Sequence, residues 1–288
     1  MEKLKAGNKV KLKVERQAPF GYFLSNGEED VLLHQSEVVG QVKLGQLLEV
    51  FLYHDSKNRL AATMLTPKIT EGEYKFLTVA DVNSRLGVYV DIGIHKDLLV
   101  SKDEMPTDKE QWPRAGDILF VGISYDKQGR MLGILGKEEN ILPLSKEAPP
   151  SLVNKFVTGT IYHVFHLGAF LLTEDGYIAF LHRDEAEGYK VRLGEKLKAR
   201  VKWVRPDGKV NLTLLPKKEE RYGRDALLIL QHLQSRNGMM PYSDETSPEV
   251  LRQKFNLSKA AFKRALGKLL KEGKVYQKDG WTYLKQDQ

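Results

Sequence analysis

The chain of 288 residues contains no cysteine. This absence excludes disulfide bonds, thiol catalysis and thiolate metal sites, and it fits a reducing compartment such as the cytoplasm. No apolar run approaches the ~20 residues that are needed to span a bilayer. The first residues alternate charged with apolar side chains, which is not the pattern of a signal peptide. The sequence therefore predicts a cytoplasmic protein that has no membrane partner.

Motifs of catalysis are missing as well. No phosphate-binding loop lies between a strand and a helix, and the acidic residues form no tight cluster of the nuclease type. His163 and His166 are the only close histidine pair, and at this spacing on a strand they are expected to point to opposite faces, which disfavours a metal site. We expect no enzyme activity, no cofactor and no metal.

The positive charge is concentrated at one end of the sequence. The formal net charge is +7, and residues 217–288 contain 15 Lys and Arg against 9 Asp and Glu. Residues 1–216 contain 30 against 29. A basic region is the electrostatic footprint of a polyanionic partner.

Three segments share one pattern of residues in the same order. The shared marks are a Gly-containing turn before an aromatic residue, a short run with a central Leu, a loop with Gly after Leu or Ala, and a hairpin. In the first copy these marks are Phe20-Gly21-Tyr22-Phe23, Leu32-Leu33-His34, Leu44-Gly45 and Asp55 to Arg59. In the second they are Leu86-Gly87-Val88-Tyr89, Leu98-Leu99-Val100, Ala115-Gly116 and Asp126 to Arg130. In the third they are Leu167-Gly168-Ala169-Phe170, Phe180-Leu181-His182, Leu193-Gly194 and Arg205 to Lys209. Such a repeat predicts three copies of one domain.

Each copy contains short runs of β-branched and aromatic residues. In the first copy the expected strands are Val10–Val14, Tyr22–Leu24, Val31–His34, Leu47–Tyr53 and Arg59–Thr63. Five short strands in ~65 residues suggest a small closed barrel of the OB type. The predicted fold class is a mainly β multidomain protein with three tandem five-stranded OB-type barrels, at 1–66, 67–146 and 147–217.

The last quarter, 218–288, changes to helical spacing and predicts a small α+β domain of the winged-helix type. The expected elements are helices at Arg224–Gln234, after Ser247-Pro248 and at Lys259–Lys271, then strands at Val275–Lys278 and Trp281–Leu284. On the third helix an apolar stripe of Phe262, Leu266, Leu269 and Leu270 is expected to face the core.

The repeated pattern resembles the RNA-binding domain of the small-subunit ribosomal protein S-one. The marks that carry the resemblance are the aromatic-Gly-x-aromatic turn, the Leu-Leu-His-x-Ser-Glu segment, the Leu-Gly-Gln loop and the Asp-x-x-x-Arg hairpin, all present in the first copy. Three such domains followed by a winged helix resemble the bacterial family called conserved virulence factor B. The resemblance implies RNA binding on the second and third strands of each competent barrel.

In the first barrel the resemblance implies an RNA-binding surface that consists of Phe20, Phe23, His34, Asp55 and Arg59. Aromatic rings stack on bases, and planar cations suit phosphates. Phe20 can share the side of Phe23 only if the chain bends at Gly21. The opposing interpretation places both phenylalanines in the core, and Asp55 could equally cap the hairpin or bind the ligand.

The other two barrels keep less of the pattern. The third barrel retains Phe170 and His182 and carries Lys209 in place of Arg59. It has Leu167 at the position of Phe20, and the neighbouring His166 could supply a substitute ring. The second has Leu86, Tyr89 and Val100 at the positions of the first barrel's rings, and residues 67–150 carry 11 basic against 14 acidic side chains. We interpret the second barrel as a spacer or a protein-contact domain.

On the third C-terminal helix, Lys259, Lys263, Arg264 and Lys268 lie off the apolar stripe and are candidates for phosphate contact. A solvated basic face is the alternative. The leading hypothesis is a non-catalytic, monomeric regulator that binds single-stranded RNA. The alternatives are an adaptor on the ribosome or on RNA-processing proteins, and a DNA-binding transcription regulator that uses the winged helix.

Overall fold

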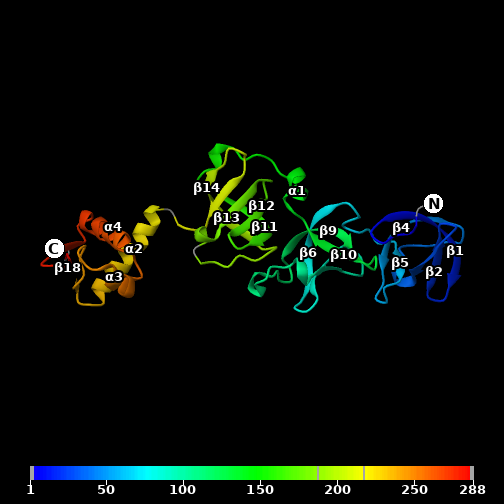
Figure 1. Ribbon diagram of the computed structural model, residues 1–288, viewed down its shortest axis with the longest axis horizontal. Helices are drawn as coiled ribbons and strands as arrows, with labels where there is room; N and C mark the ends of the chain where they lie inside the picture. Colours follow the sequence, from blue (N-terminus) through cyan, green and yellow to red (C-terminus); the bar gives the residue numbers. More distant parts are fainter. Residues whose placement is uncertain (1–2, 187, 217, 286–288) are drawn as a thin grey trace. The chain divides into compact units, whose positions relative to one another are not determined.

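The protein, seen in a computed structural model, folds into two compact units, residues 1–214 and 215–288. The structure describes residues 3–186, 188–216 and 218–285. Three closed five-stranded barrels, called here barrels 1, 2 and 3, form the first unit, and the second combines helices with a three-stranded sheet (Figure 1). The predicted fold class is confirmed.

The three barrels share one topology. Their strands are β1 (Lys9–Ala18), β2 (Gly21–Ser25), β3 (Asp30–His34), β4 (Leu47–His54) and β5 (Leu60–Thr63) in barrel 1; β6 (Tyr74–Asn83), β7 (Gly87–Val90), β8 (Leu98–Ser101), β9 (Ile118–Tyr125) and β10 (Met131–Leu135) in barrel 2; β11 (Phe156–Phe165), β12 (Gly168–Thr173), β13 (Ile178–His182), β14 (Lys196–Val204) and β15 (Val210–Thr213) in barrel 3. In each, the third and fifth strands pair in parallel and close the barrel. This is the arrangement of an OB-fold.

The first strand of each barrel is long and has an irregularity at the same place. The register shifts between Val14 and Arg16 in β1, between Val79 and Asp81 in β6, and between Ile161 and His163 in β11. An extra residue bends a strand and increases its twist, so that one strand can pair on both sides of a small barrel. The residues after the shift face the second strand from outside the barrel.

A glycine opens the second strand of every barrel. Gly21, Gly87 and Gly168 have φ of 150°, 137° and 153°. A Cβ at these positions would lie 2.1 or 2.2 Å from a carbonyl oxygen of the neighbouring strand. The glycine of the repeated turn is therefore required by the backbone, and it brings the residue before it close to the third strand.

The cores of the barrels are joined. Phe51 and Tyr53 of β4 belong to the buried cluster that fills barrel 2, and Leu193 of barrel 3 joins the same cluster. A second cluster places Phe120 of β9 against Tyr162 of β11. Burial of apolar area stabilises a structure by about 25 cal/mol per Å². The contacts between barrels therefore add to the stability of the whole first unit.

Polar contacts join the same three barrels. The Tyr125 hydroxyl donates to the Ala6 carbonyl at 2.6 Å and links barrel 2 to the segment that leads into β1. Arg192 of barrel 3 lies 3.4 Å from the Asp117 carboxylate of barrel 2, and both side chains are largely buried. A short helix, α1 (Glu138–Ile141), lies between barrels 2 and 3 in the sequence.

The second unit has the predicted winged-helix order. Its elements are α2 (Lys218–Gln234), β16 (Met239–Met240), α3 (Pro248–Phe255), α4 (Lys259–Lys271), β17 (Val275–Lys278) and β18 (Trp281–Leu284). The last four match the prediction, and Asp279 and Gly280 have the positive φ of the expected hairpin turn. The first helix starts six residues before the predicted Arg224, because Lys, Glu and Arg favour helix without adding an apolar stripe.

The buried face of α4 differs from the prediction at one residue. Leu270, predicted to face the core from α4, is 38% exposed, and Ala265 is buried in its place. The apolar stripe of α4 is therefore narrower than predicted.

No helix in the described part of the chain is long and apolar enough to cross a membrane.

Candidate nucleic-acid interface

The outer face of β2 in barrel 1 carries two rings and a cation. Phe20 is 49% exposed and contacts Phe23 edge-on, with ring centroids 6.2 Å apart. The guanidinium carbon of Arg16 lies 3.4 Å from the Phe23 centroid. The predicted bend at Gly21 does bring the two phenylalanines to one side. Arg16, which the sequence analysis missed, faces them because of the register shift in β1.

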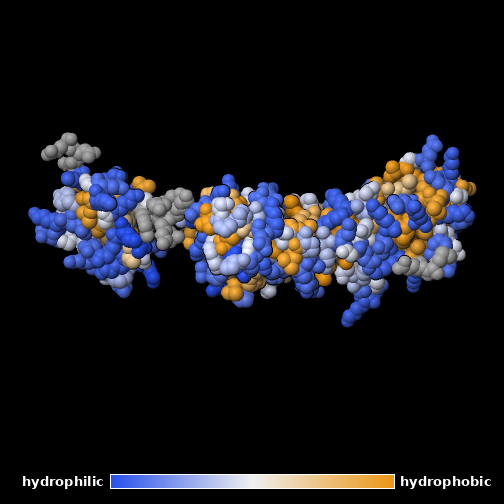
Figure 2. All heavy atoms as spheres, turned by 90° about the horizontal axis from the view of Figure 1, so that it is seen from above, coloured by the Kyte–Doolittle hydropathy of each residue, from blue (hydrophilic) through white to orange (hydrophobic). Residues whose placement is uncertain are grey.

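Hydrophobic side chains gather over the surface of barrel 1, at the right of Figure 2. The large exposed apolar residues of this barrel are Phe20, Val39, Leu44 and Leu47. Phe20 is the one among them whose side chain is an aromatic ring. Because it is exposed, it is not part of the core, and the core interpretation of this residue is wrong.

His34 ends β3 and pairs with Gly21 of β2, so its ring lies at the same end of the face as Phe20. Its Nδ1 accepts the backbone N–H of Ser36 at 3.2 Å and caps the 3-10 turn Gln35–Glu37. An accepting Nδ1 leaves Nε2 as the nitrogen that carries the proton in the neutral ring. The exposed side of the ring can therefore donate a hydrogen bond as well as stack.

Asp55 and Arg59 form a fixed pair at the β4–β5 hairpin. The Asp55 carboxylate accepts the backbone N–H groups of Lys57 and Arg59, and it also accepts from Nε and Nη2 of Arg59 at 2.9 and 2.7 Å. Partial burial alone would raise the pKa of Asp55, but these hydrogen bonds outweigh it and lower the pKa. Asp55 therefore caps the hairpin and holds the guanidinium of Arg59, whose side chain is 63% exposed.

The five predicted residues of barrel 1 do not meet at one point. β3 and β5 run in parallel with Leu32 beside Ala61. Continuing this register places Arg59 beside the first residue of β3, whereas His34 is the last. At about 3.3 Å per residue the two ends are roughly 13 Å apart. The face is therefore a strip with Phe20 and His34 at one end, Phe23 and Arg16 in the middle, and Arg59 at the other end.

Barrel 3 carries a larger set of rings on the corresponding face. They are His163, Phe165 and His166 at the end of β11, Phe170 on β12, and Phe180 and His182 on β13. Neighbouring rings are in contact, with centroids 5.6 Å apart for Phe165 and Phe170 and 5.0 Å for Phe170 and Phe180. The Nδ1 of His182 accepts the backbone N–H of Asp184, as His34 does with Ser36 in barrel 1. The predicted Phe170 thus lies at the centre of a continuous aromatic surface, and the predicted His182 lies at its edge beside Phe180.

Three members of this surface, His163, Phe165 and Phe180, were not predicted. Their signal lies in the pairing of strands: His163 is opposite Phe170, as Arg16 is opposite Phe23, and Phe180 is the other neighbour of Phe170. The expected separation of His163 from His166 holds only in part, since both rings contact the Phe165 ring. No metal-binding group of three His, Asp or Glu side chains occurs among the described residues.

Lys209 is placed differently from Arg59. Its ammonium forms an ion pair with Glu138 of α1, and only a quarter of its side chain is exposed. It follows Arg205 at the β14–β15 hairpin, where the backbone hydrogen bonds match those between Asp55 and Arg59. The position is conserved within the repeat, but the cation is directed toward the segment that connects barrels 2 and 3.

Barrel 2 lacks this kind of face. Val100 was expected at the position of His34, and this is wrong by one residue: Val100 is buried, and Ser101 is the residue that pairs with Gly87. Ser101 keeps the cap of the following turn, since its hydroxyl accepts the N–H of Asp103. Asp81 stands opposite Tyr89. Barrel 2 therefore keeps the backbone arrangement of the site, but it has Ser101 in place of the histidine and the acidic Asp81 opposite Tyr89.

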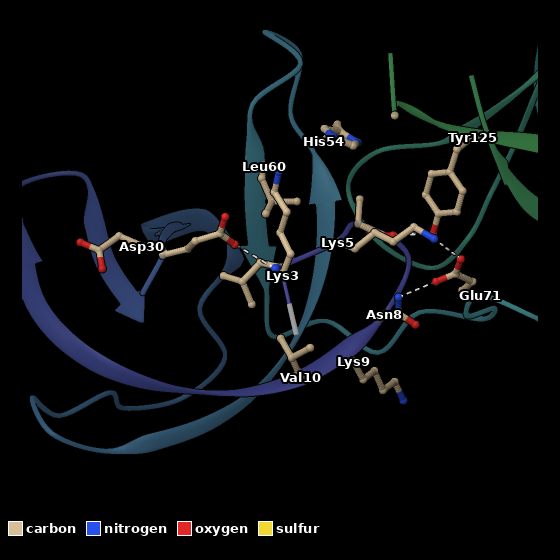
Figure 3. Close-up of a pocket in the computed structure, with 14 residues that line it drawn as sticks. Lys3, Lys5, Asn8, Lys9, Val10, Asp30, His54, Leu60, Glu71 and Tyr125 are labelled. Carbon is tan, nitrogen blue, oxygen red and sulfur yellow. Dashed lines mark hydrogen bonds and ion pairs between the residues drawn. The ribbon is translucent and has the colours of Figure 1, made fainter. Parts of the chain in front are cut away.

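A cleft of about 1380 Å³ lies between barrel 1 and barrel 2 (Figure 3). Lys5 and Asn8 both donate to the Glu71 carboxylate, and the hydrogen bond from Lys5 lowers the pKa of Glu71. Burial, followed by the charge of Glu71, raises the pKa of Tyr125 at the same place. The Lys5 and Glu71 pair therefore joins the two barrels at this cleft.

In the second unit the predicted basic residues of α4 are near acceptors. Lys259 lies 3.4 Å from the Glu245 carbonyl, Lys263 lies 3.5 Å from Asp244, and Lys268 lies 3.8 Å from Glu272. Arg264 is exposed. Exposed pairs of this length are weak, so the lysines remain available to a phosphate at small cost.

The hairpin β17–β18 carries an aromatic surface that the sequence analysis did not identify. Tyr276 and Tyr283 pair across the strands and stack at 5.1 Å, and Trp281 lies 6.5 Å from Tyr283 in a nearly parallel orientation. Lys278 pairs with Trp281 on the same face. This surface could have been predicted from the expected hairpin, because residues two apart on a strand share a face, as Trp281 and Tyr283 do on β18.

Models of known families match most of the chain. Residues 6–65 match an S1 domain, residues 74–134 the CvfB first S1-like domain, residues 141–216 the second domain of the virulence regulatory factor CvfB, and residues 228–284 the CvfB-like winged helix domain. The four matches follow the three barrels and the helical unit.

Curated relatives match over nearly the whole length. An uncharacterized protein, YitL, of Bacillus subtilis is 43% identical over 99% of this chain and 95% of its own length. Conserved virulence factor B of Staphylococcus aureus is 34% identical over 89% of this chain and 88% of its own. A crystal structure from Streptococcus pneumoniae, described as a multidomain protein with nucleic acid binding domains, is 32% identical and has a TM-score of 0.64, covering 97% of this chain and 98% of that one.

Proposed function

The chain belongs to the conserved virulence factor B family, and from this premise we propose that it is a non-catalytic regulator that binds single-stranded RNA. The bases stack on the exposed or partly exposed rings of barrels 1 and 3, and exposed guanidinium and ammonium groups contact the phosphates. The relatives that carry a functional name are virulence factors, and one matching model is named a virulence regulatory factor. Regulation at the level of transcripts fits these names and the proposed ligand.

The observation that carries the proposal is the aromatic surface of barrel 3 together with the Phe20, Phe23 and Arg16 group of barrel 1. Stacking contributes roughly 1–3 kcal/mol per base and needs rings that solvent can reach. Phe20 is half exposed, and the Phe165 and Phe170 rings are nearly parallel, at 13°. Rings of this kind suit splayed, unpaired bases better than a duplex, whose bases are stacked on one another.

The exposed histidines favour RNA over single-stranded DNA. With Nδ1 accepting from the backbone, His34 and His182 present a donating Nε2 at the edge of each ring face. A 2′-hydroxyl can accept such a hydrogen bond, and it is the group that distinguishes RNA from DNA at a site. The aromatic hairpin β17–β18 and α4 of the second unit supply further rings and cations of the same chemistry.

A titration of the full chain with single-stranded RNA, single-stranded DNA and duplex DNA at two salt concentrations tests this proposal. RNA should bind most tightly, and the logarithm of its affinity should fall with the logarithm of salt at a slope of about −0.7 per neutralised phosphate. Tightest binding to duplex DNA would instead support a transcription regulator. A flat salt response without RNA preference would support an adaptor on the ribosome or on RNA-processing proteins. The monomeric state and the cytoplasmic location stay predictions.

A further inference from the structure

Two cavities flank Phe165 and His166, at the end of β11 and beside the aromatic surface of barrel 3. One has a volume of about 410 Å³ and the other about 450 Å³. Both lie in the lower part of the range of small-ligand pockets, about 300–1,000 Å³. Each therefore has room for a single small ring system rather than for a folded partner.

One wall of both cavities comes from barrel 2. Asp108 and Gln111, in the segment between β8 and β9, line the first cavity and also the second. The backbone carbonyl of Gln111 accepts the N–H of Leu193 of barrel 3 at 2.9 Å, which fixes this residue against the barrel that carries the rings. Asp108 caps the 3-10 turn Lys109–Gln111, so its position is set as well.

The side chains that line the cavities match the parts of a nucleotide. Phe165, His166 and Tyr189 supply flat surfaces, and Arg183 supplies a cation at the first cavity. Lys190 lies 3.6 Å from Asp108 and also pairs with Glu110, so the acidic wall is balanced by a cation. A neutral base with an attached phosphate fits this combination better than an acidic or a purely apolar peptide does.

The amide of Gln111 is the group suited to read a base. Its side chain is partly buried and has no hydrogen-bond partner among the residues that the structure describes. An amide offers a donor and an acceptor side by side, and this pair is complementary to the edge of a base. The neighbouring groups that could compete for it are held elsewhere, Asp108 by the turn it caps and Lys190 by two carboxylates.

We propose that these two cavities form a base-reading subsite of the RNA strand, in which two bases unstack around Phe165 and His166 and the Gln111 amide hydrogen-bonds to a base edge. This inference rests on the proposed RNA binding and adds to it the origin of base selectivity. Barrel 2, whose own face lacks the ring set, then takes part in recognition through one loop.

The test compares the full chain with Gln111→Ala and Gln111→Leu in binding to oligo(A), oligo(C) and oligo(U) of about 16 nucleotides, the upper end of the site size of one OB-fold. The Leu variant keeps the bulk of the side chain and removes its hydrogen bonds. Gln128→Ala is the matched control, because Gln128 lies in the same barrel, in the exposed β9–β10 hairpin. Unchanged melting temperatures establish that each variant is folded.

The wild-type protein and the Gln128→Ala variant should discriminate between the best and worst oligonucleotide by about fivefold or more, the worth of one hydrogen bond of ~1 kcal/mol. Both Gln111 variants should bring this ratio to about twofold or less, with the salt slope preserved. The inference is overturned if the Gln111 variants keep the wild-type ratio of affinities, and also if the wild-type protein shows no base preference. In both cases the proposed RNA binding still stands. A wild-type protein that binds none of the oligonucleotides overturns the proposed function itself.

Discussion

Arg16 of barrel 1 and Asp81 of barrel 2 occupy the same position after the shift in register, and each stands directly opposite an aromatic residue of the second strand. In barrel 1 the guanidinium lies over the ring, and in barrel 2 an acidic residue is paired with the aromatic one. A phosphate is attracted by a guanidinium and repelled by a carboxylate. The proposed RNA binding therefore predicts that the two faces differ in their response to substitution at this position.

Replacing Arg16 by Ala should weaken the affinity for single-stranded RNA about three- to tenfold, because a cation over a ring and a phosphate contact are lost together. Lys11→Ala is the control: Lys11 is exposed on the same strand but pairs with Glu49 of β4, on the other side of β1. Fluorescence anisotropy with labelled RNA measures both. Equal effects of the two substitutions would show that only net charge matters.

The triple variant Phe20→Ala, Phe23→Ala and Arg59→Ala should bind RNA more than about tenfold less tightly and remain folded, since stacking contributes ~1–3 kcal/mol per base. The same truncation in barrel 2, at Leu86 and Tyr89, should leave affinity nearly unchanged. Circular dichroism monitors folding in both. Unchanged RNA affinity in the folded triple variant would disprove the site in barrel 1.

Asp55→Ala should destabilise the first unit by roughly 1–2 kcal/mol, because four hydrogen bonds at the hairpin lose a charged acceptor. Its effect on RNA affinity should be smaller than that of Arg59→Ala, since Asp55 positions the guanidinium and does not itself attract phosphate. Urea denaturation and RNA titration give the two values. A larger loss of affinity for Asp55→Ala than for Arg59→Ala would point to direct contact with the ligand.

The second unit should lose stability as pH falls from 7.5 to 5.5. Burial, and after it the charges of Arg236 and Lys254, lower the pKa of His232 below its ordinary 6.5. Below pH 6.5 the unfolded chain therefore takes up a proton that the folded state resists, and stability falls until the folded pKa is passed. The Glu249 and Glu272 carboxylates, whose pKa values are also lowered, act only at more acidic pH.

Hydrogen exchange of the amides of α4 and β18 in the full chain measures this loss. His232→Phe should flatten the pH response, because the Nε2 that is buried without a partner is gone and the Tyr242 and Phe255 rings still have a ring to contact. His166→Asn, in the first unit, should leave it unchanged. A pH response of equal size in His232→Phe would assign it to other groups.

Much of the fold follows from the sequence because its signals are local. The Gly of the repeated turn, the strand at Val31–His34 and the Ser247-Pro248 start of α3 each depend on neighbouring residues, and all were predicted. The rings of barrel 3 depend instead on the pairing of β11 with β12. A one-residue shift between Ile161 and His163 decides which side chains share a face, and no local pattern reports such a shift.

The same limit explains the error at Val100 and the omission of Gln111. Val100 and Ser101 differ by one residue, which is enough to move a side chain from the core to the surface. Gln111 is separated from Phe165 by more than fifty residues, and only the packing of barrel 2 on barrel 3 brings them to common cavities. Residues that meet across two domains cannot be found by reading either domain alone.

Because Phe51 and Tyr53 of barrel 1 are buried in the core of barrel 2, truncation is a poor instrument for dissecting this protein. A fragment that stops after β5 would present two aromatic side chains and the apolar strand around them to water, and a fragment that starts at β6 would lack part of its own interior. Loss of binding in either fragment would reflect aggregation or partial unfolding as readily as loss of a contact. Roles of individual barrels are better assigned with point substitutions in the intact chain.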